Sequence, residues 1–392
     1  MEINLSTKFC GLTFKNPIII SAGIHGRDGE TMKKISHSGV SAICTKTIVS
    51  QPAKDVLPCF VSVRAGMLNS VFGSDRPSEY WFSEGIKKAK EGEALVIANL
   101  AGFNPEESAR LALKAEKAGA DIIEIPTHCP HMGEILSAMF PDMNFPEPEL
   151  TDFKPMKKTI RLIKNVVKVP VIVKLSGTFS HITKEWALEV EKSGADGISC
   201  SDALGPALSI DIRTGQPKLG GPRGVGGLTG SAIMPITLRM VLDIALSTNL
   251  PIIGVGGVST ASDVVEYIMA GATLVGVCTA GHLKGDQQYS KIIKDLEKLL
   301  SDLGVSSPEE IKGLTLKRIK ERKEKNLVAV TEKIIPKVDE NLCNSCGRCE
   351  QVCAYGAAKV NDKLHIDSSH CIGCGLCVSV CPNNAISQTY YR

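Results

Sequence analysis

Residues 105–126 read PEESARLALKAEKAGADIIEIP, and this stretch contains the pattern that decides the fold. Residues 105–118 have the length and pattern of a helix, and the apolar, β-branched run 120–125 is typical of a buried strand. Gly119 stands between them, where a left-handed C′ residue commonly ends a helix. Pro126 ends the strand because proline has no N–H for pairing. The stretch therefore predicts a helix followed directly by a buried strand.

The same order of helix, glycine and strand recurs along residues 1–302. The glycine junction appears again at Ser38-Gly39-Val40, Ser193-Gly194-Ala195 and Ala270-Gly271-Ala272. The strand-like runs are residues 17–22, 39–48, 94–100, 120–125, 170–176, 195–200, 250–255 and 272–278. Eight such strands alternating with helices predict an α/β fold, a (β/α)8 TIM barrel over residues 1–302 that opens with a short hairpin in residues 1–15. An open doubly wound sheet is the alternative, but no G-x-G-x-x-G opens the first helix.

The composition is that of an ordinary globular protein. The chain has 392 residues, of which 43% are hydrophobic and 22% are charged, so a full core can be buried. A formal net charge of +3 gives little support to a nucleic-acid or anionic-membrane partner. No apolar run approaches the ~20 residues that span a bilayer, and residues 1–4 lack the pattern of a secretory signal. We therefore expect a cytoplasmic protein.

Cysteine is the most informative residue type in the composition. Eight of the 14 cysteines fall in two runs between Cys343 and Cys381, each with gaps of two, two and three residues. This is the spacing of two-cluster ferredoxins, in which the fourth cysteine of each run ligates the other cluster. The spacing predicts two [4Fe-4S] clusters, one held by Cys343, Cys346, Cys349 and Cys381, and the other by Cys371, Cys374, Cys377 and Cys353. Zinc held by four cysteines at each site is the alternative, which the two complete repeats disfavour.

The cysteine-rich segment is predicted to form a second domain with an electron-transfer role. We place this ferredoxin-like domain at residues 336–392. Residues 303–335, which include the charge run 319–325, are expected to be a linker or helical connector. Because iron–sulfur clusters pass single electrons, the domain is expected to conduct electrons to or from the barrel.

Glycines and lysines stand at the C-terminal ends of the predicted strands, where barrel chemistry takes place. After the seventh and eighth strands, Gly256-Gly257 and residues 276–279 (GVCT) are suited to hold the phosphate of FMN, a cofactor that exchanges one or two electrons. Lys46 and Lys174 end apolar strands, and a lysine is seldom buried without a partner. Each is expected to meet either the flavin edge, which becomes negative on reduction, or a carboxylate on a neighbouring strand.

A cysteine flanked by two histidines follows the fourth predicted strand. Cys129 lies three residues after Pro126, with His128 before it and His131 after it. By themselves these side chains are compatible with an acid–base site, a metal site or no site. The electron-conducting tail and the flavin-suited barrel favour acid–base chemistry at Cys129.

With these features the chain resembles the dihydroorotate dehydrogenase superfamily. Together with its tail, it most resembles the iron–sulfur catalytic subunit of bacterial NAD-dependent dihydropyrimidine dehydrogenase. The matching segments are Thr45-Lys46-Thr47, Cys129-Pro130-His131, Lys174-Leu175, residues 227–239 (GLTGSAIMPITLR) and Gly256-Gly257. The resemblance implies that Cys129 protonates one substrate carbon while the neighbouring carbon receives hydride from the flavin. The implied cofactor contacts are Ala22, Gly23, Lys46, Thr47, Asn99, Lys174, Gly230, Gly256, Gly257, Cys278 and Thr279, and Asn69 is an implied substrate contact.

The chain departs from the family pattern where the substrate would bind. The family's Asn-x-Ser-Cys-Pro is replaced by Pro126, Thr127, His128 and Cys129-Pro130, and a proline side chain offers no hydrogen bond. After the sixth strand, the Asn-Thr pair that reads a pyrimidine becomes Asp202-Ala203. Because a site that hydrogen-bonds its substrate loses heavily when partners are unmatched, we expect the same chemistry on a different substrate. His128 and Asp202 are candidate substrate contacts; the alternatives are a solvated loop residue and a carboxylate bonded only to the backbone.

The sequence thus predicts an FMN- and iron–sulfur-dependent oxidoreductase that reduces or oxidises a C=C or C=N bond of a cyclic, heterocyclic substrate, as dihydropyrimidine and dihydroorotate dehydrogenases do. The alternatives are a non-pyrimidine substrate, an electron-transfer subunit of a larger complex, and a tRNA dihydrouridine synthase-like barrel, which the net charge of +3 does not favour. No dinucleotide-binding fingerprint is evident in the chain. We expect a separate NAD(P)H-oxidising flavoprotein or a soluble ferredoxin as the electron partner and, by resemblance, a homodimer.

Overall fold

A computed structural model describes residues 3–128, 133, 136–137 and 152–388 of the chain. The chain divides into two compact units, Met1–Leu316 and Lys317–Arg392, and each is considered by itself. Among the described residues, no helix is both long enough and apolar enough to span a lipid bilayer.

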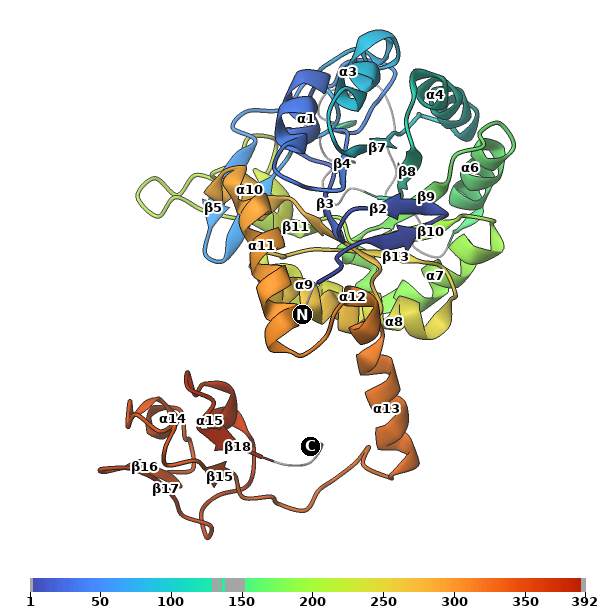
Figure 1. Ribbon diagram of the computed structural model, residues 1–392. Helices are drawn as coiled ribbons and strands as arrows, with labels where there is room; N and C mark the ends of the chain where they lie inside the picture. The colour runs from blue at the N-terminus through green and yellow to red at the C-terminus, as the bar shows by residue number, and fades with distance from the viewer. Residues whose placement is uncertain (1–2, 129–132, 134–135, 138–151, 389–392) are drawn as a thin grey trace. The chain divides into compact units, whose positions relative to one another are not determined.

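The first unit is a closed barrel of parallel strands, which confirms the predicted TIM barrel (Figure 1). Its strands occur in the chain as β3 (Ile18–Ile20), β4 (Ala42–Cys44), β7 (Leu95–Asn99), β8 (Ile122–Pro126), β9 (Val171–Leu175), β10 (Gly197–Cys200), β13 (Ile252–Val255) and β14 (Leu274–Val277). Each lies within one of the eight predicted runs or, in β8, ends one residue beyond it. The predicted hairpin is also present, as β1 (Thr7–Phe9) paired antiparallel with β2 (Leu12–Phe14).

Helices follow the strands around the outside of the barrel (Figure 1). The longer ones are α1 (Gly29–Ser36), α4 (Pro105–Ala118), α6 (Lys154–Lys164), α7 (Thr183–Lys192), α8 (Met234–Ser247), α9 (Ala261–Met269) and α11 (Gln287–Asp302). A further helical stretch combines α2 (Ser78–Tyr80), η2 (Trp81–Gly85) and α3 (Ile86–Lys90). The four junction glycines have left-handed φ angles between +88° and +113°, as the sequence predicted: Gly39, Gly119, Gly194 and Gly271.

Alternation along each strand separates two apolar cores. Residues such as Ile18 and Ile20 face outward and pack in the larger core with the helices, whereas Ile19 faces the barrel interior. The interior core also contains Ala42, Ile97, Ile122, Ile172, Ile253 and Leu274. Phe9 and Phe14 of the hairpin pack in the same core, and Phe9 lies against Gly197 at the amino end of β10. The hairpin therefore closes the amino-terminal end of the barrel.

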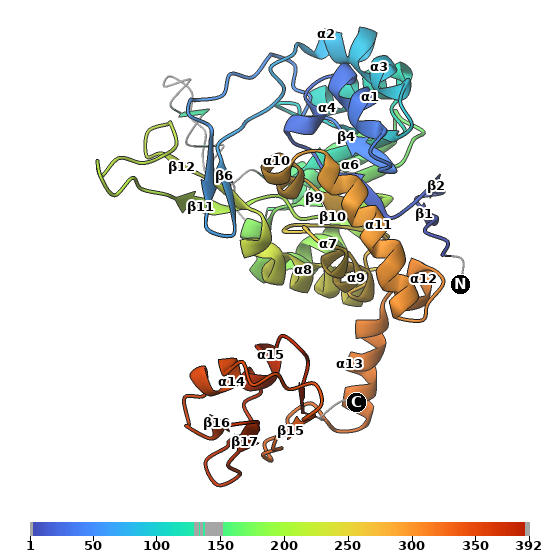
Figure 2. The same cartoon turned by 60° about the vertical axis from the view of Figure 1, so that its left-hand side comes forward.

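Two long connections, after β4 and after β10, build a second sheet that the sequence did not predict. Its antiparallel order is β11-β12-β6-β5, made of β5 (Phe60–Val63), β6 (Gly66–Asn69), β11 (Leu204–Leu208) and β12 (Val225–Thr229) (Figure 2). From the spacing of the predicted strands, the sequence indicates long connections after the second, fourth and sixth strands, and predicts only lids or binding loops there. The third long connection, after β8, lies largely outside the described residues.

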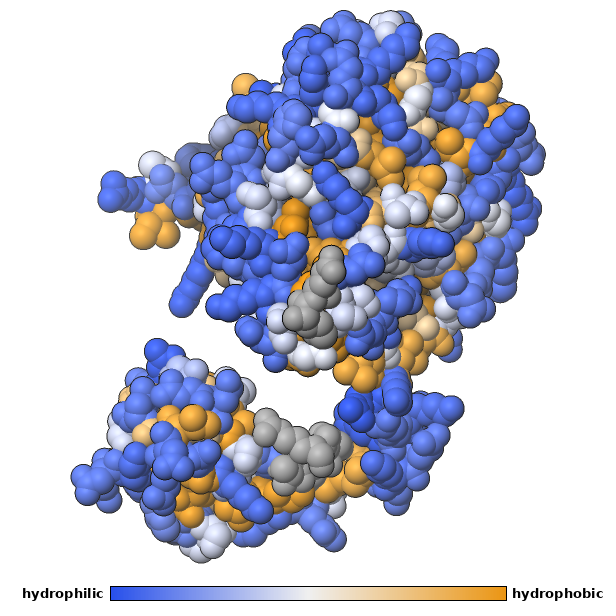
Figure 3. Space-filling model, in the orientation of Figure 1, coloured by the Kyte–Doolittle hydropathy of each residue, from blue (hydrophilic) through white to orange (hydrophobic). Residues whose placement is uncertain are grey.

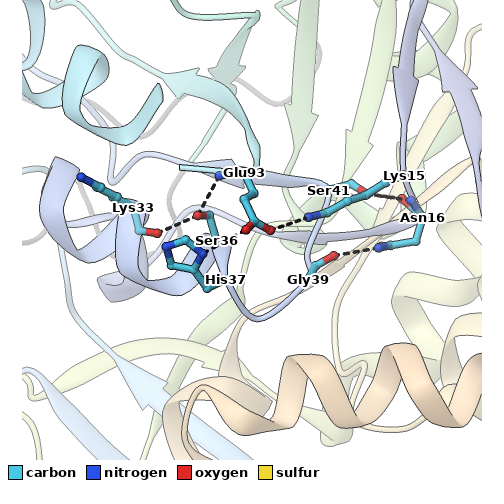
Figure 4. A network of polar contacts seen from close by, with 8 residues as sticks. All are labelled: Lys15, Asn16, Lys33, Ser36, His37, Gly39, Ser41 and Glu93. Carbon is cyan, nitrogen blue, oxygen red and sulfur yellow. Dashed lines mark hydrogen bonds and ion pairs between the residues drawn. The ribbon is translucent and has the colours of Figure 1, made fainter. Parts of the chain in front are cut away.

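Polar contacts hold together the segments that lead into the amino ends of β3, β4 and β7 (Figure 4). The Asn16 amide donates to the Gly39 carbonyl over 2.8 Å, and the Ser41 hydroxyl donates to the Asn16 carbonyl over 2.6 Å. Glu93 pairs with His37 at 3.2 Å and with Lys15 at 3.5 Å. In barrels of this kind, that end serves stability and the opposite end carries the chemistry.

The second unit contains two similar halves. In one, α14 (Arg348–Gln351) begins after left-handed Gly347, and in the other α15 (Leu376–Ser379) begins after left-handed Gly375. Two small sheets complete it, pairing β15 (Lys337–Val338) with β18 (Ile386–Ser387) and β16 (Ala358–Val360) with β17 (Leu364–Ile366). Figure 3 shows a mostly hydrophilic surface with hydrophobic patches on both units. Helix α12 (Pro308–Ile311) lies in the first unit, whereas α13 (Leu314–Glu324) continues along the chain from the first unit into the second and contains residues 319–324 of the charged segment predicted to be a connector.

Candidate active site

The interior of the barrel changes from apolar to polar at the C-terminal ends of its strands. Side chains two residues apart share a face of a strand, so Ile97 is followed inward by Asn99, Ile122 by Glu124 and Ile172 by Lys174. We call the resulting ring of buried side chains the mouth layer: Ser21, Cys44, Asn99, Glu124, Lys174 and Ser199. Two predicted cofactor contacts, Asn99 and Lys174, lie in this layer.

The mouth layer contains a buried ion pair between neighbouring strands. Lys174 Nζ lies 2.9 Å from Glu124 Oε2, and both side chains are only 4% exposed. Burial is the largest single influence and alone would lower the pKa of Lys174 and raise that of Glu124. The attraction between the two charges, together with hydrogen bonds to Glu124 and other negative groups near Lys174, outweighs burial, so the pKa of Lys174 is raised and that of Glu124 is lowered. Of the two partners left open by the sequence, Lys174 therefore has the carboxylate of a neighbouring strand. Sequence reasoning missed Glu124, although a single carboxylate inside the apolar run IIEI was its signal.

Among the polar atoms of the mouth layer, the Ser21 hydroxyl oxygen and the Asn99 side-chain oxygen have no hydrogen-bond partner within the described part of the chain, and both are fully buried. The amide nitrogen of the same Asn99 side chain donates to Glu124 over 2.6 Å, which leaves its oxygen available for another group. Because buried polar atoms are rarely unpaired in native proteins, these two fit a polar ligand bound over the barrel mouth.

Predicted phosphate-binding glycines lie together beside the mouth layer. A Cβ added to Gly257 would lie 2.6 Å from the Met234 Cβ and 3.0 Å from the Gly230 carbonyl oxygen. One added to Gly230 would lie 3.4 Å from the Thr279 methyl, and one on Gly256 would lie 2.6 Å from the Thr237 hydroxyl. We call Gly230, Gly256, Gly257 and Thr279 the cradle. These close approaches bring glycine backbone together after the seventh and eighth barrel strands, the position at which many barrels bind a phosphate.

Cys278 and Gly23 meet where the chain leaves β14 and β3, beside a cluster of aromatic rings. A Cβ on Gly23 would lie 2.6 Å from Cys278 Sγ, and this sulfur lies 3.8 Å from the Ala22 carbonyl oxygen. Burial raises the pKa of Cys278 to about 11 and lowers that of His282, whose Nε2 is 3.7 Å from the sulfur, to about 4. The pair is therefore neutral near pH 7, which disfavours a thiolate nucleophile here.

Two histidines contribute to this cluster that sequence reasoning did not single out. His282 packs edge-on against His25, with ring centroids 4.8 Å apart, and His25 Nδ1 lies 2.7 Å from the Tyr289 hydroxyl. They come from opposite ends of the barrel sequence, so no local pattern connected them.

Lys46, Thr47 and Asn69 hold the connections that enter the second sheet. Lys46 Nζ lies 3.3 Å from Asp55 Oδ2, so its partner belongs to a loop and not to a neighbouring barrel strand. The Thr47 carbonyl accepts from the Ser74 backbone N–H over 2.8 Å. Asn69 ends β6, and its amide donates to the Gly227 carbonyl of β12 over 3.4 Å.

The predicted acid–base residue, Cys129, lies outside the described residues, as does His131. The structure describes the chain up to His128. The Thr127 N–H and hydroxyl both donate to the Lys174 carbonyl, over 3.1 and 2.8 Å, and fix the exit of the chain from β8. The His128 ring packs against Phe179 with centroids 4.7 Å apart.

Asp202 follows β10 at the same end of the barrel. Its side chain accepts from the Ala203 N–H over 2.8 Å, a backbone bond that the sequence left open as one of two roles. The negative charge of Asp202 also raises the pKa of Lys174, although burial opposes this and Glu124 contributes more. Asp202 therefore acts electrostatically on Lys174 of the mouth layer.

In the second unit, the cysteines of the two sequence runs surround two separate cavities. One cavity is lined by Cys343, Cys346, Cys349 and Cys381, and the other by Cys353, Cys371, Cys374 and Cys377. Backbone N–H groups point at two of the sulfurs, from Gly373 to Cys371 over 3.4 Å and from Ala385 to Cys381 over 3.3 Å. Such hydrogen bonds to sulfur are a feature of iron–sulfur sites. In each cavity, three cysteines come from one sequence run and the fourth comes from the other run.

A parallel barrel with a polar mouth, a glycine cradle after its last strands and a cysteine-rich second unit defines a class: cofactor-dependent oxidoreductases of the TIM-barrel type with an iron–sulfur domain. Comparison with known families agrees. Residues 4–300 match the dihydroorotate dehydrogenase family, and residues 335–358 and 364–387 each match a 4Fe-4S binding domain. The chain belongs to the dihydroorotate dehydrogenase family. Membership implies FMN, and the two smaller matches imply 4Fe-4S clusters.

Two similar curated proteins share the printed name dihydroorotate dehydrogenase B (NAD(+)), catalytic subunit. The Methanothermobacter thermautotrophicus protein is 34% identical over 315 residues, which cover 80% of this chain and 99% of that protein. The Pyrococcus furiosus protein is 35% identical over 316 residues, covering 80% of this chain and 100% of that protein. The chain is accordingly an oxidoreductase that acts on a CH–CH bond, with chemistry like that of dihydroorotate dehydrogenase.

Proposed function

We propose that FMN binds across the mouth layer and that a cyclic nitrogen heterocycle gains or loses two hydrogens there. The observation that carries this proposal is the pair of buried atoms, Ser21 Oγ and Asn99 Oδ1, that lack partners among the described residues. A polar ligand over the barrel mouth would complete them, and the cradle beside them suits a phosphate. When bound, FMN supplies hydride exchange with the substrate and single-electron exchange with iron–sulfur clusters.

Two groups of residues are proposed to bind different parts of FMN. Asn99, Lys174 and Lys46, with Thr47 beside it, are proposed to contact the flavin ring. The remaining proposed contacts, to the ribityl chain and phosphate, are Ala22, Gly23, Gly230, Gly256, Gly257, Cys278 and Thr279. Support for this second group comes from the close approaches among the glycines, which leave room for backbone but not for side chains.

Cys129 is the proposed general acid or base at the substrate carbon next to the one that exchanges hydride. The two hydrogen bonds from Thr127 to the Lys174 carbonyl support this role, because they anchor the chain to β9 two residues before Cys129. A thiol held there would deliver or remove one proton while the hydride moves at the neighbouring atom. His128 and Asn69 are also proposed to contact the substrate.

The substrate is proposed to be a ring related to the pyrimidines but bound differently from uracil. Pro126 lies opposite Lys174 in the β8–β9 register and presents no hydrogen-bonding side chain to the site. Asp202 supplies a carboxylate where an amide is expected, so an N–H-rich or cationic ring edge would suit it. We therefore propose that the chain shares its chemistry and its electron path with dihydropyrimidine dehydrogenase, but contacts the substrate ring with different residues.

The proposed electron path runs through two [4Fe-4S] clusters, one in each cysteine-lined cavity, to a partner outside the chain. The relatives are named catalytic subunits and carry NAD(+) in their names, which supports a partner that handles a nicotinamide. We propose a separate NAD(P)H-oxidising flavoprotein or a soluble ferredoxin, a homodimeric assembly and a cytoplasmic location.

The test is cofactor content followed by a substrate screen. Protein purified anaerobically should show flavin absorbance and about eight iron atoms per chain, from two four-iron clusters. The reduced protein is then mixed with oxidised heterocycles, including orotate, uracil and thymine, and flavin reoxidation is followed. At least one ring other than uracil and thymine should reoxidise the flavin. Iron near zero with bound zinc would refute the electron path, and efficient turnover of uracil or thymine would refute the argument from Pro126 and Asp202.

A further inference from the structure

Glu124 makes more contacts in the mouth layer than a simple counter-ion needs. Its Oε2 atom lies 2.9 Å from Lys174 Nζ on β9, 2.6 Å from Asn99 Nδ2 on β7 and 3.3 Å from Cys44 Sγ on β4. The barrel order places β4, β7, β8 and β9 side by side, so one carboxylate oxygen ties together four adjacent strands. All four side chains are buried.

We propose that Glu124 is a positioning residue for the oxidoreductase reaction, which holds Asn99 and Lys174 toward the barrel mouth and offsets the lysine charge beside the flavin. This inference rests on the proposed binding of FMN over the mouth layer. Asn99 donates its N–H to Glu124, which fixes its free oxygen on the other side of the amide. Lys174 is held so that a ligand meets a neutral ion pair instead of an isolated cation.

The charge balance has a measurable consequence for the flavin. The flavin edge becomes negative on reduction, so an uncompensated cation beside it favours the reduced form and an uncompensated anion favours the oxidised form. In the wild-type chain the two charges cancel to first order. Lys46 differs, because its partner Asp55 comes from a loop and the pair is longer, at 3.3 Å. The Lys174 pair is thus the fixed part of the electrostatic environment.

The test measures the midpoint potential of bound flavin in Glu124→Gln, Lys174→Met and the double variant. Glu124→Gln should raise the potential and Lys174→Met should lower it, each by at least a tenfold change in the oxidised-to-reduced ratio, or about 30 mV for two electrons. The double variant should return toward the wild-type value, and it removes any dependence on whether the single Glu124 variant folds. Glu106→Gln is the matched control, because it removes a carboxylate from an exposed pair with Lys158 of 2.6 Å.

The possible outcomes separate this inference from the proposed function. Wild-type protein without FMN would overturn both. Bound FMN with an unchanged potential in Glu124→Gln, or a double variant that keeps the Lys174→Met shift, would overturn the inference alone. A shift in the Glu106→Gln control as large as that in Glu124→Gln would also overturn it, since the effect would then be one of net charge and not of position.

Discussion

At the buried pair of Glu124 and Lys174, a single substitution is expected to change both the stability of the barrel and the properties of the flavin site. Exposed ion pairs elsewhere on the barrel are worth about 0–1 kcal/mol, because water screens them. Removing one partner of a buried pair leaves an unpaired ion, at a cost of roughly 3–5 kcal/mol. We therefore expect Glu124→Gln to destabilise the barrel far more than Glu106→Gln, in addition to its effect on the flavin.

A first residue-scale prediction concerns the cradle. Gly257→Ala should raise the dissociation constant of FMN by at least about tenfold, because its Cβ would lie 2.6 Å from the Met234 Cβ and 3.0 Å from the Gly230 carbonyl at a φ of +78°. Gly194→Ala is the control: it has a similar φ of +88° with no atom within 4 Å, so it should show only the left-handed penalty of about 1–2 kcal/mol in stability. FMN titration by flavin fluorescence measures the difference. Equal FMN affinity in the two variants would refute the cradle.

A second residue-scale prediction concerns His282. Burial lowers its pKa from 6.5 to about 4 in the folded barrel. Between these values the unfolded chain binds more protons than the folded chain, so the free energy of unfolding should fall as pH decreases from 6.5 toward 4, by about 2–3 kcal/mol. His282→Gln should flatten this dependence, and a variant that keeps the wild-type slope between pH 6.5 and 4 would contradict the assignment. Urea unfolding followed by tryptophan fluorescence reports on the barrel, because both tryptophans of the chain, Trp81 and Trp186, are buried there.

At the scale of elements, the sequence was sufficient for the barrel and insufficient for the sheet beside it. Barrel strands are continuous apolar runs, and glycine ends the helices before four of them, so both signals are local. The strands of the β11-β12-β6-β5 sheet lack such a signal: β11 reads LGPAL, with a glycine and a proline, which strands disfavour. Its β12–β6 pairing joins segments far apart in the chain, such as Gly227 and Asn69, which no local pattern reveals.

The same distinction applies to the candidate site. Positions such as Lys46, Asn99 and Lys174 could be predicted because they end recognisable strands, and strand ends converge in a barrel. The carboxylates that pair with the two lysines, Asp55 with Lys46 and Glu124 with Lys174, could not be assigned from local patterns. Glu124 depends on which face of β8 points inward, and Asp55 depends on the path of a loop.

An element-scale prediction concerns the start of α9, which follows the cradle directly. The Thr260 hydroxyl accepts from the Asp263 N–H over 3.3 Å, and the Asp263 carboxylate accepts from the Thr260 N–H over 2.8 Å, forming a capping box. Thr260→Ala should lower the free energy of unfolding by about 1 kcal/mol, whereas Thr260→Ser should keep most of the stability that the capping box contributes. Urea unfolding gives both values, and an alanine variant as stable as wild type would show that the box contributes nothing.

At the scale of the whole molecule, the chain joins two units with different electron chemistry. The alignment with the Methanothermobacter thermautotrophicus relative covers 99% of that protein but only 80% of this chain. Both 4Fe-4S matches of this chain lie after residue 300, where the match to the barrel family ends. A barrel of this family with its own iron–sulfur unit carries both hydride and single-electron steps in one polypeptide. The two units can therefore be tested by separate signals, flavin absorbance for one and iron content for the other.

A whole-molecule prediction follows from the two cavities of the second unit. Cys381→Ser and Cys346→Ser should lose the same cluster, because both residues line one cavity although they come from different sequence runs. Cys353→Ser and Cys374→Ser should lose the other cluster. Each variant should retain about four iron atoms per chain, and Cys59→Ser, in the barrel, should retain about eight. Electron paramagnetic resonance of the reduced proteins identifies the missing cluster; matching spectra for Cys381→Ser and Cys374→Ser would contradict the cross-run ligation.

The central claim is that flavin chemistry at the barrel mouth is coupled to proton transfer by Cys129. The most direct test is the rate at which a productive heterocycle reoxidises the bound, reduced flavin in a single turnover, compared between wild type and Cys129→Ala, with Cys59→Ser as a control thiol. Loss of the general acid should slow reoxidation by about 10²–10⁴-fold while FMN content and iron content stay at wild-type levels. Reoxidation of Cys129→Ala at the wild-type rate would contradict the account.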